Sequence, residues 1–467
     1  MSDFVPHEVI FQILSHLPVE TLIKCTLVCK EWYALITSSS FINAHLATTL
    51  AKPLISQPIL TRRFTDSPNK EHYFLHLNHK SMDTCQAIKK SPLKPIENLY
   101  PRIVGTVNGL ICLSDDLFGY TNRILLWNPL VRRSMELPMP NVTYKDFGPY
   151  SFILGFGFDA KKNDYKVVRL LYPQSEEGNP PKVEVFSVME KKWRMISGEG
   201  IKFCFVEPGW TQCFLNGRVH WIAYEKNTRG GGRNWVVLFD MEDEKFRKMK
   251  LPQPVDTTNP MNVFISVTKG VLTVCSYYSL TLEIEADDRY CDIWEKTEYG
   301  DSKSWTKLYT VEIDVLGRTG RVVGLTGNDE LLIATDDHGG SAFLSRFEVR
   351  SGNLVLYDPK SRMTNLVVQP QGVIDSFFAG EYIESLVFLN KESGATSYEG
   401  AKIEEKGKSF IADSEGSAKH VLKEDRSMMG SSSNDSDEEE EEDGLFGRNG
   451  LAFQKMIAFS VQLQKLM

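Results

Sequence analysis

The sequence predicts a mainly β protein, in which a small helical module of residues 1–46 precedes a β-propeller-like domain of residues 52–390. Three observations support this prediction. Helical spacing of apolar residues is confined to the start of the chain, short β-branched and aromatic runs separated by turn residues fill the middle, and these runs repeat at a blade-like interval. Residues 391–467 lose the pattern and are predicted to be a disordered, acidic tail.

The first 46 residues have helical periodicity. Pro6 suits the first turn of a helix, Pro18 begins a second helix, and a third carries Trp32 before the serine triplet 38–40. The apolar residues that share one face of the first helix are Val9, Ile10, Ile13, Leu14 and Leu17. A three-helix unit of about 40 residues cannot bury all its large apolar side chains internally. These helices therefore either dock on the rest of the chain or bind another protein.

The middle of the chain repeats one strand pattern. A strand that ends in an aromatic residue recurs at separations of 53–63 residues, at Trp127, Phe186, Phe239, Trp294 and Tyr357. A turn followed by an apolar strand recurs at Asn108, Asn216, Lys269 and Asn328. The interval fits one four-stranded blade with its loops. The runs PLISQPIL and YFLHL before the five units and ESLVFL after them could complete a sixth blade, so about six blades are expected.

A two-sheet β-sandwich is the competing fold for this region. Its roughly 340 residues are too many for one sandwich, and a sandwich leaves the repeat unexplained.

Charge and cysteine usage narrow the class of protein. The run 435–443 holds eight acidic residues, and the rest of the chain balances 53 acidic against 53 basic residues. No basic footprint for nucleic acid or a membrane surface is present. No signal peptide or apolar span of roughly 20 residues is found. The eight cysteines show no disulfide framework. We expect a protein of the cytoplasm, the nucleus or both.

Catalytic signatures are lacking. The sequence has no Gly-x-Ser-x-Gly, His-Glu-x-x-His or phosphate-loop motif, and the glycines 230–232 suit a hairpin tip. On a strand, His72 and His76 would share a face and His79 would point away, which disfavours a metal site. We predict no catalytic, cofactor-binding or metal-binding residue, and a propeller-fold enzyme is the less favoured alternative.

Two segments carry a family resemblance. The run VPHEVIFQILSHLPVETLIKCTLVCKEWYALITSSSFINAHL resembles the F-box over its whole length. From about Val104 to Leu389, the segments VNGLICL, GFGFDAKKNDYKVVRLL, LNGRVHW, LVLYDP and EYIESLVFL resemble the plant F-box-associated domain, which is kelch-like. The chain is similar to plant F-box and S-locus F-box-like proteins, and the acidic tail lies outside the resemblance.

The resemblance implies a non-catalytic receptor subunit of an SCF-type ubiquitin ligase. In the family, the F-box binds a Skp-type adaptor, which binds a cullin and a RING subunit, while the second domain binds a protein substrate for ubiquitination and proteasomal degradation. A scaffold without ligase activity is the alternative. The match implies that the adaptor contacts are drawn from Val5, Pro6, Ile10, Ile13, Leu14, Leu17, Pro18, Leu22, Leu27, Val28 and Trp32, although some of these must hold the helices together.

The substrate and its contact residues are not predicted. The candidate substrate-binding segments are the long polar loops 139–151, 172–182, 224–234, 253–262 and 336–347.

Overall fold

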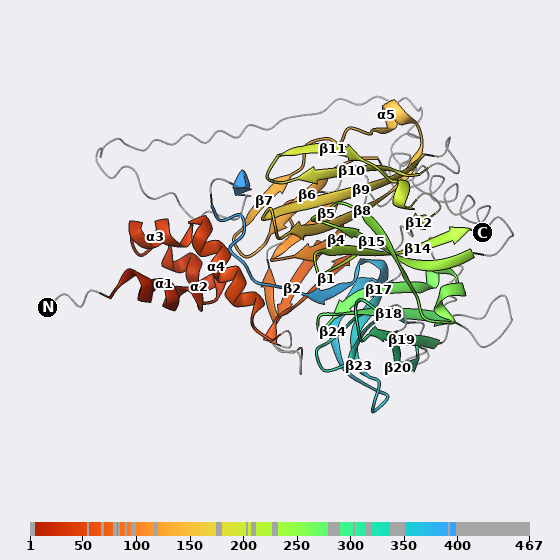
Figure 1. Cartoon of the computed structure of the whole chain (residues 1–467). Helices are drawn as coiled ribbons and strands as arrows, with labels where there is room; N and C mark the ends of the chain where they lie inside the picture. Colours follow the sequence, from red (N-terminus) through yellow and green to blue (C-terminus); the bar gives the residue numbers. More distant parts are fainter. Residues whose placement is uncertain are drawn as a thin grey trace, which may run out of the picture. The chain divides into compact units, whose positions relative to one another are not determined.

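The computed structural model describes residues 5–397 with short gaps, and the acidic run lies outside the described residues. The gaps are residues 54–55, 67–69, 78–81, 83–84, 89–90, 95–99, 116–119, 174–179, 202–203, 207–211, 227–231, 279–289, 302–303, 314–319, 337–350 and 391–392. Within the described residues, the strands form six antiparallel sheets, the blades of a six-bladed β-propeller (Figure 1). The predicted mainly β fold and blade count are confirmed, and the β-sandwich alternative is excluded.

The first three sheets are built from strands that follow one another in the chain, except that β25 joins the first sheet and β26 joins the second from the end of the chain. The first has the order β25-β1-β2-β3, with β1 at Ile59–Thr65, β2 at Lys70–His76, β3 at Cys85–Ile88 and β25 at Phe378–Glu381. The second has the order β26-β7-β6-β5-β4, with β4 at Arg102–Val107, β5 at Leu110–Ser114, β6 at Ile124–Asn128, β7 at Arg133–Glu136 and β26 at Thr396–Ser397. The third has the order β11-β10-β9-β8, with β8 at Tyr150–Asp159, β9 at Asp164–Pro173, β10 at Lys182–Ser187 and β11 at Lys192–Ile196.

The other three sheets repeat this arrangement. The fourth contains β12 at Cys204–Val206, β13 at Cys213–Leu215, β14 at Arg218–Lys226, β15 at Gly232–Asp240 and β16 at Phe246–Lys250, and both β12 and β13 pair with β14. The fifth contains β17 at Val263–Thr268, β18 at Val271–Tyr278, β19 at Tyr290–Lys296 and β20 at Trp305–Glu312. The sixth contains β21 at Gly320–Leu325, β22 at Leu331–Asp336, β23 at Ser351–Asp358 and β24 at Met363–Val373. Short helical turns in the connections are α5 at Tyr144–Phe147, η2 at Glu199–Ile201, η3 at Val255–Thr257, η4 at Pro260–Asn262 and η5 at Ile374–Ser376.

Two-residue turns set the strand register in three blades. In the β4–β5 hairpin, Asn108 and Gly109 have φ of 50° and 80°, and Val107 pairs with Leu110. The central residues 216–217 and 269–270 of the corresponding hairpins also have positive φ. Type I′ turns need this geometry at both positions, which explains the Asn-Gly, Asn-Gly and Lys-Gly pairs. The turn predicted at Asn328 also precedes a strand, β22, but it lies in a longer loop between Leu325 and Leu331.

The repeated aromatic residues occupy equivalent positions. Each lies in the third strand of its blade, at Trp127 in β6, Phe186 in β10, Phe239 in β15, Trp294 in β19 and Tyr357 in β23. Four of the five are buried, and the exception is Trp294, which is half-buried. A large ring at this position fills the space between neighbouring sheets.

The ring is closed by a strand other than the one the sequence suggested. β25 pairs antiparallel with β1, joining Glu381 to Ile59 and Phe378 to Arg62. The run ESLVFL forms no strand, so its prediction as a closing strand is wrong. The reason lies in the Asn128 side chain, whose Nδ2 donates to the carbonyls of Ser385 and Val387 at 3.0 and 2.9 Å. A side chain thus satisfies backbone groups that a sheet would otherwise pair.

Residues 393–397 lie inside the segment predicted to be disordered. β26 in this segment pairs with β7 at the edge of the second sheet, joining Thr396 to Ser134. Composition cannot reveal such an interaction, because the free hydrogen-bonding edge of β7 is created by the fold.

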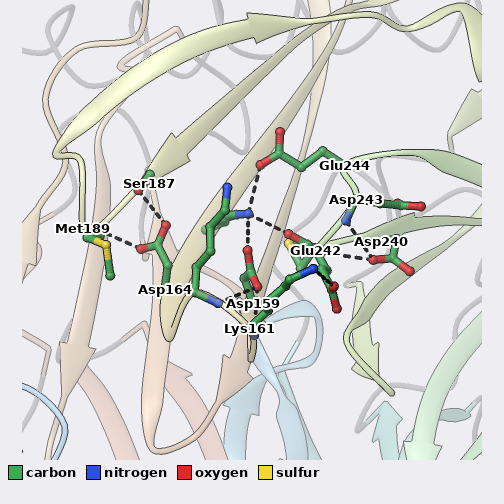
Figure 2. Close-up of polar contacts among 12 residues, drawn as sticks. Asp159, Lys161, Asp164, Ser187, Met189, Asp240, Glu242, Asp243 and Glu244 are labelled. Atoms are coloured by element: carbon green, nitrogen blue, oxygen red, sulfur yellow. Dashed lines mark hydrogen bonds and ion pairs between the residues drawn. The ribbon is translucent and has the colours of Figure 1, made fainter.

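Neighbouring blades are also joined by buried charges. Lys166 of β9 is 1% exposed, and its Nζ lies 2.7 Å from Asp159 Oδ2, 2.9 Å from Glu244 Oε1 and 2.6 Å from the Met241 carbonyl oxygen. Asp159 ends β8 of the third sheet, and Glu244 lies in the turn between β15 and β16 of the fourth. Figure 2 shows the Glu244 carboxylate above this contact and the Asp159 carboxylate below it. Burial raises the pKa of Glu244, but hydrogen bonds from Arg194 and Lys166 outweigh it, so the pKa lies below its usual value. Such a compensated cluster ties the two blades together.

Four helices precede the propeller, one more than predicted. They are α1 at His7–Ser15, α2 at Val19–Cys25, α3 at Lys30–Ile36 and α4 at Ser39–Leu50. The last helix crosses the predicted module boundary at residue 46. Ser38 explains this result, because its Oγ accepts the Phe41 N–H at 3.2 Å and so begins a helix where the serine triplet suggested only a break.

A buried histidine joins α4 to the junction between α1 and α2. His45 Nε2 lies 3.0 Å from the Leu17 carbonyl oxygen, and since a carbonyl only accepts, Nε2 carries the proton. Burial lowers the pKa of His45 below its usual value. The neutral ring is therefore the form that fits this core.

We expect the closing strand to be essential for folding. A chain ending at residue 377 should lose cooperative thermal unfolding, whereas a chain ending at residue 397 should keep it. The shorter chain loses the β25–β1 pairing and the burial of Tyr382, Leu386 and Phe388. Burial of each such side chain contributes about 1.5–3 kcal/mol, against a typical total stability of about 5–15 kcal/mol. Near-UV circular dichroism during heating measures the difference, and equal unfolding temperatures for the two chains would contradict the prediction.

Acidification should destabilise the helical module through His45. The unfolded chain binds a proton near its ordinary pKa of about 6.5 while the folded chain resists it, so the free energy of unfolding should fall as pH drops from about 6.5 toward the lowered pKa. The variant His45→Gln keeps an N–H donor for the Leu17 carbonyl but cannot bind this proton. Its free energy of unfolding should therefore change less with pH than that of the parent, by up to about 1.4 kcal/mol per pH unit. Urea unfolding at pH 7.5 and 5.5 tests this. His76 and His220 also have lowered pKa values and remain in both proteins, so the informative quantity is the difference between variant and parent. Identical slopes would rule out this role for His45.

Candidate functional site

The helical module sorts its apolar side chains into two sets. The inward set is buried and belongs to one cluster with residues of the second sheet and with Leu386 and Phe388. Its members are Leu14, Val19, Leu22, Ile36, Phe41 and Ile42. The helices therefore dock on the propeller through this set, which confirms one of the two explanations for the excess of apolar residues.

Segment 382–390 forms the contact between propeller and helices. Asn390 Nδ2 lies 3.3 Å from Ser39 Oγ, and the Glu384 carboxylate accepts the backbone N–H of Val19 at the start of α2. Burial raises the pKa of Glu384. On its other side, the segment is fixed to the second sheet, where Tyr382 Oη donates to the Gly109 carbonyl at 2.8 Å. Docking is thus held by polar as well as apolar contacts.

The outward set remains exposed. Fifteen large apolar side chains are exposed in the described part of the chain, and six of them lie within residues 5–33. They are Val5, Val9, Ile13, Leu27, Val28 and Tyr33, with Leu27 70% and Val28 64% exposed. Val9 and Ile13 lie four residues apart on one face of α1, and Leu27 and Val28 lie between α2 and α3. We call these six residues the outward set.

Charged residues accompany the outward set. Glu8, Lys30 and Glu31 are exposed, and Lys24 Nζ lies 2.9 Å from Glu20 Oε1. Cys29 caps α3 by accepting the Trp32 N–H on its sulfur at 3.4 Å. An apolar area beside solvated charges is the usual composition of a protein–protein interface.

The predicted adaptor contacts differ in their exposure. Val5, Pro6, Ile13, Pro18, Leu27 and Val28 are exposed, and Ile10, Leu17 and Trp32 are half-buried. Leu14 and Leu22 are 1% and 0% exposed, so they hold the module together and cannot touch a partner while it is folded. Val9 and Tyr33 are exposed as well, although the sequence did not place them among the contacts. Val9 could have been found, because it precedes Ile13 by one helical turn.

The structure gives no support for a metal site in the described residues. No group of three or more potential metal ligands occurs there, and the cysteines are free. His76 is buried on β2 with Nε2 2.9 Å from Thr61 Oγ1 and Nδ1 2.9 Å from the Met82 carbonyl oxygen, so both ring nitrogens have partners. His79, Gly230 and Gly231 lie outside the described residues. No helix in the described residues is long and apolar enough to cross a membrane.

The candidate substrate loops are only partly described. Loops 139–151 and 253–262 are complete, whereas the other three are interrupted by gaps. Loop 139–151 contains α5 and exposes Met139, Tyr144 and Phe147.

Comparison with known proteins matches both parts of the chain. Residues 66–388 match the family model of the F-box associated beta propeller domain, and residues 3–43 match the F-box-like model. The Arabidopsis thaliana protein named F-box protein At3g07870 is 26% identical, over 77% of this chain and 86% of its own. F-box/kelch-repeat protein At3g23880 from the same plant is 26% identical, over 72% and 86%. Arabidopsis F-box protein CPR1 is 28% identical, over 66% and 73%.

The two family models cover both structural parts described above. The F-box-like match ends at residue 43, inside α4, and the propeller match extends from β2 to segment 382–390. Since the propeller model covers more than half of the sequence, the chain belongs to the plant F-box proteins that carry a C-terminal F-box-associated β-propeller domain.

Proposed function

We propose that this protein is the substrate-recognition subunit of an SCF-type ubiquitin ligase. In this proposal, a Skp-type adaptor binds the outward set and carries the cullin and the RING subunit, and the propeller binds a protein substrate for ubiquitination and degradation. The observation that carries the proposal is the outward set itself. The propeller already covers the inward set, so the remaining exposed apolar residues of the module need a partner from outside the chain.

The energy of adaptor binding would come from burial. Removing a Leu or Ile side chain from water contributes about 1.5–3 kcal/mol, so a few residues of the outward set suffice for a stable contact. Polar side chains beside them would align the partner and contribute less.

The propeller would contribute position and not chemistry. Holding a substrate in the same assembly as a charged conjugating enzyme raises their effective concentration, and no catalytic residue of this chain is needed. Its docking on the helices supports this role, because a firmly held propeller keeps the substrate at a fixed distance from the adaptor. We place this activity in the cytoplasm, the nucleus or both. A scaffold that binds only the adaptor is the alternative, and cullin recruitment distinguishes the two.

Charge substitutions in the outward set should abolish adaptor binding without unfolding the protein. We expect Ile13→Asp and Leu27→Asp each to weaken binding of a Skp-type adaptor roughly 10- to 100-fold, since each loses its apolar burial and desolvates a carboxylate. Both side chains are exposed, so the unfolding temperature should stay unchanged. Isothermal titration calorimetry of the full chain with purified adaptor measures the effect.

Leu77→Asp is the matched control for these variants. Leu77 is half exposed like Ile13, but it follows β2 in the first propeller sheet. The Leu77→Asp variant should bind the adaptor as tightly as the parent chain does. If Leu77→Asp weakens binding as much as Leu27→Asp, or if Leu27→Asp binds normally, the adaptor surface lies elsewhere.

Ligase activity should depend on the same surface. Affinity purification of the full chain under proteasome inhibition should recover adaptor, cullin and RING subunit, together with ubiquitinated proteins. Leu27→Asp should retain the substrate proteins but lose the adaptor, the cullin and the ubiquitin chains. Mass spectrometry of the two samples compares them.

The scaffold alternative predicts a different composition. Under that alternative, the parent chain recovers adaptor without cullin, and no protein in the sample carries more ubiquitin than in the Leu27→Asp sample. This result would refute the ligase proposal while leaving adaptor binding intact.

A further inference from the structure

The channel of the propeller contains a cavity of about 400 Å³. Its walls include residues of β4, β13, β17, β21 and β25, which belong to five different blades. Much of the lining is apolar, including Phe264, Val267, Val323 and Phe377. A cavity of this size and composition is typical of a small-molecule site.

One of the residues that line the cavity is a buried arginine. Arg62 of β1 is 3% exposed and lines the cavity. Its Nη2 donates to the Pro101 carbonyl at 3.2 Å, and its guanidinium carbon lies 4.9 Å from the centre of the Tyr100 ring. The Nε and Nη1 atoms are buried and have no hydrogen-bond partner among the described residues. A buried cation in this state is costly unless a negative charge lies nearby.

Arg169 shows how the same protein treats another buried arginine. Arg169 of β9 is fully buried, and its Nη1 lies 2.8 Å from the carboxylate of Glu184. Its Nη2 donates to Asn122 Oδ1 at 2.7 Å. Each buried charge of that pair is neutralised from within the fold. Arg62 forms no comparable ion pair with a described residue, which sets it apart.

Two further arginines and two acidic residues line the cavity. Arg102 and Arg321 also line it, and Arg321 Nη1 lies 4.0 Å from Asp375 Oδ1. The other lining acid is Glu381, which accepts the Lys269 N–H at 2.9 Å and lies three residues along β25 from the partner of Arg62. That spacing is roughly 10 Å in a strand. Because the surroundings are of low dielectric, an uncompensated guanidinium raises the potential inside the cavity.

We propose that the channel binds a small organic acid, with its carboxylate near Arg62, Arg102 and Arg321 and its apolar body against Phe264, Val323 and Phe377. A monoanion suits the site, because Asp375 already accompanies Arg321 and because the apolar walls cannot replace the water shell of a dianion. The inference is independent of ligase activity, since it concerns only the propeller.

Ligand-dependent stabilisation of the full chain tests the proposal. The probes are hexanoate, which combines a carboxylate with an apolar body, 1-hexanol, which lacks the charge, and inorganic phosphate, which lacks the body. At pH 7.5 and constant ionic strength, hexanoate should raise the unfolding temperature saturably, and the other two should not. Isothermal titration calorimetry then gives the dissociation constant.

Two variants locate the site. Arg62→Met should weaken hexanoate binding at least tenfold, and Arg63→Met should leave it unchanged. Arg63 is the neighbouring residue on the same strand, does not line the cavity and donates to the Pro370 carbonyl. Without ligand, Arg62→Met should be at least as stable as the parent, because it removes a buried charge that forms no ion pair with a described residue. If Arg62→Met does not fold, Arg321→Gln serves as the second variant and should weaken binding at least threefold.

Several outcomes would overturn the proposal. One is that hexanoate produces no saturable shift in the parent chain. A second is that phosphate or 1-hexanol binds as tightly as hexanoate. A third is that the substitution at Arg62, or at Arg321 where that variant is used, binds hexanoate like the Arg63→Met control. None of these results affects adaptor binding, so the failure of this proposal and that of the ligase proposal are distinguishable.

Discussion

Pairing of β25 with β1 is the interaction on which the rest of the structure depends. It joins residues more than 300 positions apart and turns six sheets into a closed ring. In this arrangement β25 covers the edge of β1 that would otherwise present unpaired backbone groups. The closing strand is only four residues long, but it fixes everything that follows it. Segment 382–390 emerges beside the second sheet, where Asn128 and Gly109 bind it.

The position of that segment decides how the helical module is used. Leu386 and Phe388 give the inward set of apolar side chains a place to pack, and Glu384 and Asn390 add polar contacts to α2 and α4. Once those residues are buried, the outward set is what remains available to a partner. The module is therefore completed from two sides, by its own chain and by a proposed adaptor. A mobile tether between the two domains would not divide the apolar surface in this way.

The buried cations of the propeller are stabilised in different ways. Lys166 and Arg169 each lie against carboxylates, so their burial links elements without leaving a bare charge. Arg62 has backbone and aromatic contacts but no ion pair with a described residue. Lys296 is also buried and contacts the Asp301 carbonyl and the Trp305 ring, but it does not line the cavity. Arg62 does line the cavity, and we attribute its position there to ligand binding.

The sequence alone determined the features that depend on local chemistry. Turn pairs such as Asn108-Gly109 have the positive φ that their residues favour, the aromatic residues mark the third strand of five blades, and the helices of the F-box follow their apolar spacing. Only the tertiary structure decided which apolar residues face inward, because Ile13 and Leu14 are equivalent by sequence and differ only in what lies beside them. Only the tertiary structure likewise decided which segment closes the ring, that β26 pairs with β7, and that Arg62 forms no ion pair with a described residue. Each depends on partners distant in the chain, whose proximity is fixed by ring closure and not by neighbouring residues.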